Sequence, residues 1–204
     1  MEVILTAIVA IVLLVAGLIA LSYFYSVTHS VIDTIKTRLF IYSLENLLAG
    51  ISTRLPQPLK CDLAKLTITV SINGKIIVKY DIPNVIVEAY WPNPKCKAPP
   101  LNPWVNASPY CIFVNFSKIL QEDANICTKE QQCVVNVYSI VNGSTLANYI
   151  IASTKDIVIK VPKDTSLSIV IGGKPLINLQ HNSENRVILV RVIFFRPTSY
   201  WNPA

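Results

Sequence analysis

Residues 3–25 read VILTAIVAIVLLVAGLIALSYFY, a run without a single charged side chain. The hydrocarbon core of a bilayer, about 30 Å thick, needs roughly 20 helical residues to cross it, so this run is long enough to span a membrane. A cleavable secretory peptide has a positive start, a shorter apolar stretch and a small-residue cleavage site. Here the start is Met1-Glu2, and no lysine or arginine precedes Lys36. The stretch therefore predicts a membrane-inserted helix that is kept in the protein.

Helical spacing continues beyond this run. No proline occurs before Pro56, and apolar residues recur in steps of three and four. They are Val27, Val31, Ile35 and Leu39, followed by Ile41, Leu44, Leu48 and Ile51. We predict one helix from residue 2 to about residue 54, roughly 80 Å long at 1.5 Å per residue, stopped by Gly50 and then by Pro56 and Pro58. An anchor needs no apolar stripe outside the bilayer, so this stripe is expected to pack on the head or on identical helices.

The charges divide the chain in the same place. Residues 1–55 hold three basic and three acidic side chains, so the whole formal charge of +6 belongs to residues 56–204. The lysines there are scattered singly and form no block or helical stripe, a pattern that does not favour nucleic-acid binding. We therefore expect a neutral helix, residues 1–55, and a basic head, residues 56–204.

From residue 65 onward the apolar period changes to two, which is typical of strands. Residues 66–72 and 75–80 alternate on either side of Asn73-Gly74, a strong signal for a β-hairpin. Further strands are predicted over 85–91, 110–116, 134–141, 149–153, 156–161, 166–171 and 186–195, and residues 119–126 form either a short helix or a loop. Many short strands in one unit favour a sandwich. The expected fold class is α+β, with one long N-terminal α-helix and an all-β immunoglobulin-like sandwich head.

Residues 92–109 contain six prolines. They are expected to form a stiff, irregular surface loop, because proline cannot donate to a strand ladder. Trp91 and Trp104 either offer a partner surface there or fold down onto the edge of the sandwich.

Five cysteines occur, all in the head, and extracellular domains use cysteine chiefly for disulfides. We predict the pairs Cys127–Cys133 and Cys96–Cys111, with Cys61 unpaired. The two histidines lie far apart and no CxxC spacing occurs, so no metal site or cofactor is expected. No motif of a hydrolase, metalloprotease or nucleotide-binding loop is present, and we expect no enzyme. Three Asn-x-Ser sequons, at Asn106, Asn115 and Asn142, are candidate glycosylation sites, Asn142 foremost because Asn142-Gly143 reads as an exposed turn.

The order of a wholly apolar helix, an amphipathic continuation and a β-rich head resembles the type IV pilin family, and its archaeal branch in particular. Motif-level similarity is confined to about the first 25 residues. The sequence departs from the family because no short basic leader ending in glycine precedes the apolar run, and because its acidic residue, Glu2, lies nearer the start. Either a leader has been removed, which the absence of positive charge before the run supports, or Met1, the only methionine, is the start.

The resemblance implies a subunit that is inserted in the cytoplasmic membrane, then polymerises with identical subunits into an extracellular filament at the cell surface. The heads would make surface or cell contacts that serve adhesion or motility. Glu2 would neutralise the terminal amine of a neighbour, or alternatively lie among lipid headgroups. The expected filament core is made by Glu2, Val3, Leu5, Ile8, Ile11, Leu14, Leu18, Leu21, Val27, Val31, Ile35, Leu39, Leu44 and Leu48.

An alternative interpretation is a signal-anchored extracellular binding module, similar to the β-sandwich stator proteins of the archaeal motility machinery. It needs no leader. The two interpretations differ in whether residues 26–55 are buried against other copies of the chain or solvated beside the head.

Overall fold

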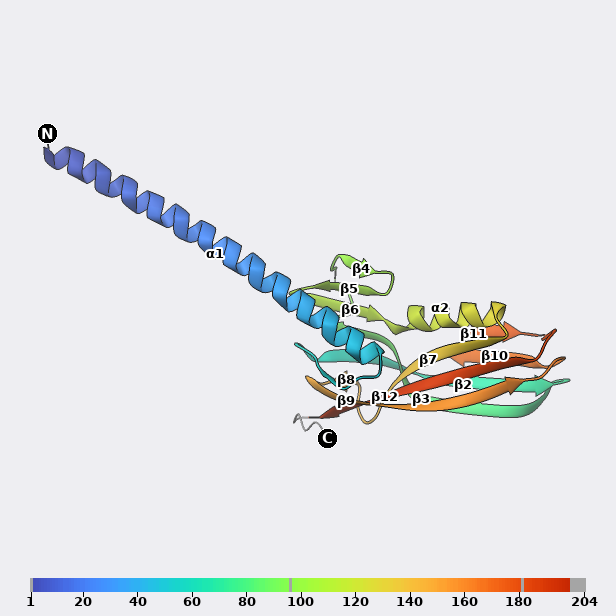
Figure 1. Cartoon of the computed structure of the whole chain (residues 1–204). Helices are drawn as coiled ribbons and strands as arrows, with labels where there is room; N and C mark the ends of the chain where they lie inside the picture. The colour runs from blue at the N-terminus through green and yellow to red at the C-terminus, as the bar shows by residue number, and fades with distance from the viewer. Residues whose placement is uncertain (1, 96, 181, 199–204) are drawn as a thin grey trace.

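A computed structural model describes residues 2–95, 97–180 and 182–198 of the chain, with side chains in the first helix from residue 12 onward. A long helix, α1 (Glu2–Leu48), projects from a β-rich head (Figure 1). The fold class is α+β with a β-sandwich-like head, as predicted. The head contains β1 (Thr53–Arg54), β2 (Leu59–Ile72), β3 (Lys75–Trp91), β4 (Pro100–Asn102), β5 (Val105–Ser108), β6 (Cys111–Asn115), α2 (Phe116–Lys129), β7 (Gln132–Ile140), β8 (Thr145–Leu146), β9 (Tyr149–Val161), β10 (Ser166–Ile171), β11 (Lys174–Leu179) and β12 (Arg186–Thr198).

The end of α1 is set by Gly50. Its φ is +74°, a left-handed conformation that glycine adopts without steric cost. The Gly50 amide donates to the Leu47 carbonyl at 3.0 Å, and the Ile51 amide donates to the Asn46 carbonyl at 2.8 Å, which together form a Schellman motif. The prediction of a helix to about residue 54 is therefore wrong: α1 ends at Leu48, and residues 53–54 form β1 against β9.

The strands form two layers that share one core. β12 lies between β9, its antiparallel neighbour, and β7, its parallel neighbour. β3, β2, β10 and β11 follow in that order in the second layer, and β7 meets β3 at a single pair, Val85 and Ser139. Buried residues from both layers and from α2 make one cluster, which includes Ile68, Val137 and Val190.

A second buried cluster joins α1 to the head. Phe40, Leu44 and Leu47 of α1 are almost fully buried in it, beside residues of β2, β5, β6, β7 and β12. Burying a large apolar side chain completely is worth about 1.5–3 kcal/mol. The last three turns of α1 are therefore part of the head's own core.

The proline-rich segment, residues 92–109, differs from the prediction of an irregular loop. The structure also decides between the alternatives left open for residues 119–126 and for the two tryptophans. Part of the proline-rich segment forms β4 and β5, which pair with each other. This is possible because the Asn102 side chain accepts hydrogen bonds from the Trp104 and Val105 amides at 3.0 and 2.7 Å and so builds the turn between them. The segment predicted as a short helix or a loop is the helix α2. Trp91 and Trp104 pack against the second buried cluster, so they fold down onto the head.

Candidate assembly interface

The described part of α1 is long and apolar enough to cross a membrane. Within Val12–Leu48, the most apolar window of 18 residues has a mean hydropathy of 1.7, and none of that window is buried in the subunit. No charged side chain occurs in Val12–Leu48 before Asp33. Leu14, Leu18 and Leu21 are all exposed, as are the consecutive aromatic residues Tyr23, Phe24 and Tyr25. The helix therefore presents an uncovered apolar surface to its surroundings.

Several hydroxyl groups of this helix are satisfied within it. Ser22 donates to the Ile19 carbonyl and Thr28 to the Phe24 carbonyl, both at 2.8 Å. Thr34 makes the same contact with the Ser30 carbonyl. A hydroxyl that bonds its own backbone costs little in apolar surroundings, so these residues are compatible with either lipid or a helix bundle.

The predicted filament-core residues are divided between two faces of α1. Val27, Val31, Ile35 and Leu39 are exposed, whereas Leu44 is buried in the head and Leu48 packs against the same cluster. Leu44 is therefore not accessible for contact between subunits, because the head already covers it. Glu2, Val3, Leu5, Ile8 and Ile11 lie in α1, and their side chains are outside the described residues.

An apolar face, interrupted by the exposed side chain of Arg38, remains on the side of α1 that turns away from the head. We call it the outward face and define it as Val27, Val31, Ile32, Ile35, Leu39 and Tyr42, which are between 41% and 65% exposed. At about 100° per residue, its centre lies roughly 150° around the helix from Phe40, Leu44 and Leu47. In Figure 1 the first half of α1 extends well beyond the head.

Polar contacts fix the angle between α1 and the head. The Tyr110 hydroxyl donates to Asp33 Oδ2 at 2.9 Å, a contact that joins residues 77 positions apart. This hydrogen bond raises the pKa of the Tyr110 phenol, which therefore stays protonated as the donor. The Tyr138 hydroxyl donates to the Leu48 carbonyl at 3.3 Å. Sequence reasoning missed these braces, since nothing local in the sequence signals a contact over such separations.

One of the two predicted disulfides is confirmed. Cys127 and Cys133 are bonded and close a polar loop between α2 and β7. The other predicted pair involves Cys96, which lies outside the described residues. Cys61 is a free, buried thiol, as predicted, and burial raises its pKa to about 12. The Cys61 thiol is therefore protonated at neutral pH and unreactive.

The three sequons lie in different surroundings. Asn142 is exposed and has a φ of +63° in the turn that follows β7. Asn106 is half-buried in β5. Asn115 caps α2, and its Oδ1 accepts a hydrogen bond from the Lys118 amide at 3.0 Å. Asn142 is therefore the most exposed of the three sequon asparagines.

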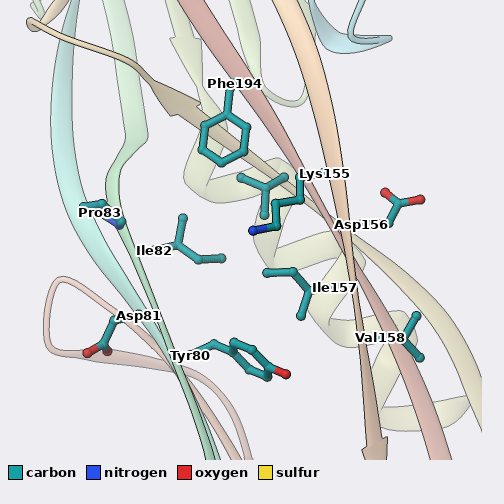
Figure 2. A pocket seen from close by; sticks show the side chains of 10 residues that line it. Tyr80, Asp81, Ile82, Pro83, Lys155, Asp156, Ile157, Val158 and Phe194 are labelled. Carbon is teal, nitrogen blue, oxygen red and sulfur yellow. The ribbon is translucent and has the colours of Figure 1, made fainter.

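The head also contains an open cleft between β3 and β9, with a volume of about 490 Å³. Ile82, Ile157 and Lys155 point into it, whereas Asp81 and Asp156 point away (Figure 2). The two carboxylates pair elsewhere: Asp81 with Lys65 at 2.9 Å and Asp156 with Arg191 at 3.0 Å. No group of three or more His, Cys, Asp or Glu side chains that could hold a metal ion occurs in the part of the chain that the structure describes. The cleft therefore offers apolar contact and one positive charge.

Comparison with known proteins gives no relative: no protein-family description, curated protein or solved structure matches this chain.

Proposed function

We propose that this protein is the structural subunit of an extracellular filament of the archaeal type IV pilus kind. In this proposal α1 is inserted in the cytoplasmic membrane before assembly and packs with the α1 helices of identical subunits afterwards. The heads cover the outside of the filament and serve adhesion or motility. The observation that carries the proposal is the outward face of α1, an apolar surface that lies beyond the uncharged run of residues 3–25 and that the head does not cover.

The position of the membrane boundary decides whether the outward face lies in lipid or in water. Tyr23, Phe24 and Tyr25 are exposed, and aromatic residues concentrate at the membrane–water boundary. If the boundary lies at these residues, the 14 residues from 26 to 39 extend about 20 Å before Phe40, the first buried residue of α1. The head contacts this stretch on one side, where Tyr110 donates to Asp33. A solitary anchored subunit would leave the apolar outward face in water along this distance. Contact with identical helices removes it from water.

Burial of the outward face contributes favourable free energy to assembly. The six residues of the outward face are each about half exposed, and burying the exposed half of a large apolar side chain is worth about 1 kcal/mol. One such face therefore contributes about 6 kcal/mol before the entropic cost of association is subtracted, and the apolar run before residue 26 adds to it. Contacts between different patches on successive subunits extend into a helical polymer when the rotation between subunits does not close a ring.

Labelling of an introduced thiol tests the proposal. In cells that express the Ile35→Cys chain, a membrane-impermeant maleimide should fail to label residue 35 until detergent dissociates the filaments. Val158→Cys is the matched control, because Val158 is similarly exposed but lies on the head; it should be labelled before and after detergent. Equal labelling at both positions in intact cells would contradict the filament proposal and favour a solitary anchored binding module.

A further inference from the structure

The cleft between β3 and β9 is bordered by two strand edges with unused backbone groups. β9 pairs with β12 along its length, but its other edge pairs only with β1, at Tyr149 and Ile150. The Ala152 amide donates to the Ser52 hydroxyl at 3.1 Å, and otherwise the backbone from residue 151 to residue 161 has no strand partner on that side among the described residues. β3 pairs with β2, and on its other side only Val85 and residues 88–91 have strand partners. Unpaired edges of this kind are templates on which an extended peptide adds a strand.

The two edges are not equivalent. Pro83 lies on the open part of β3, and proline has no amide to donate to an added strand. No proline interrupts β9 between residues 151 and 161. The β9 edge is therefore the better template.

The side chains of the cleft select what can bind there. The floor is apolar, with Ile82 and Ile157 facing each other below Phe194 (Figure 2). The charged end of Lys155 points into the same space, and the Lys155 side chain makes no ion pair or hydrogen bond among the described residues. An inward-pointing charge on an edge strand discourages pairing with an uncharged strand, because that pairing would cover the charge without a partner. The same charge favours a strand that brings a carboxylate.

We propose that the β9 edge binds an extended segment of a partner protein that carries a glutamate or aspartate between apolar residues. The bound segment extends the sheet beyond β9. Its inward apolar side chains lie against Ile82, Ile157 and Phe194, and its carboxylate pairs with Lys155. This site belongs to the head, so it is independent of whether the chain polymerises through α1.

Two synthetic peptides test this inference on the full chain in detergent: acetyl-Thr-Val-Thr-Glu-Thr-Val-Thr-amide and the same peptide with glutamine in place of glutamate. The glutamate peptide should bind saturably by titration calorimetry, about fivefold more tightly than the glutamine peptide, as expected for one partly exposed ion pair. Backbone amides of residues 151–161 should gain protection from hydrogen exchange when it binds. Lys155→Met, which keeps much of the aliphatic stem and removes the charge, should abolish the preference while the thermal midpoint stays unchanged.

Four outcomes would overturn the inference. They are no saturable binding of either peptide, equal affinity for both peptides, a preference that survives in Lys155→Met, and protection outside residues 151–161. Acetate serves as a further probe: if it displaced the glutamate peptide at equal concentration, the cleft would be a site for small anions and the strand interpretation would be wrong.

Discussion

Replacing Ile35 with aspartate should abolish assembly and leave the head folded. Ile35 is 51% exposed in the subunit, so burying its remaining surface against a neighbouring helix contributes about 1 kcal/mol. Aspartate at this position enters an apolar interface, and a rise of roughly three units in its pKa corresponds to about 4 kcal/mol. The combined loss of about 5 kcal/mol per subunit raises the concentration needed for assembly by about a thousandfold or more, at 1.4 kcal/mol per tenfold.

The assay is removal of detergent from the purified full chain, followed by sedimentation and negative-stain electron microscopy of the pellet. Val158→Asp is the matched control, since Val158 is 55% exposed on β9 and outside α1. The control should assemble at the wild-type concentration, whereas Ile35→Asp should stay in the supernatant with the head's circular dichroism unchanged. Filaments of Ile35→Asp at the wild-type concentration would refute the assignment of the outward face to the filament core.

Three further predictions concern the stability of the head, each measured by thermal unfolding in detergent. Leu47→Ala should destabilise it by about 3 kcal/mol, because Leu47 is completely buried where α1 joins the head; an unchanged midpoint would mean that α1 does not pack there. Gly50→Ala should cost about 1–2 kcal/mol, because the residue has a φ of +74° and an added Cβ would lie 3.1 Å from a threonine methyl group, whereas Gly17→Ala, in open space, serves as a neutral control. Replacing the Cys127–Cys133 pair by serines should cost about 2 kcal/mol, the value for a loop this short, and an equal midpoint with and without reductant would contradict a stabilising role.

Local signals in the sequence predicted the elements whose structure is decided locally. The Asn73-Gly74 turn between β2 and β3 is present, with φ values of +48° and +77°, because few other residues adopt that conformation without strain. The six-residue separation of Cys127 and Cys133 likewise made their disulfide predictable. Gly50 was predicted as a helix stop, but the helix was predicted to continue to about residue 54, whereas α1 ends at Leu48. The sequence pattern did not show that Gly50 adopts the left-handed conformation that completes the Schellman motif.

The parts that could not be predicted depend on contacts between distant residues. The parallel pairing of β7 with β12 joins segments about 55 residues apart, and hydrophobic periodicity does not specify a partner strand. The apolar spacing of α1 was visible, but periodicity alone did not separate Leu44, which faces the head, from Ile35, which faces away. That distinction depends on where the head folds back, and it decides which residues of the helix are available to a neighbouring subunit.

Electron microscopy of material sheared from native cells without detergent, with mass spectrometry of the same fraction, tests the central claim most directly. The filament proposal predicts thin helical filaments in which this chain is the main protein component, with α1 helices in the core and heads outside. Recovery of the chain only in detergent-extracted membranes, with no filament that contains it, would contradict the proposal.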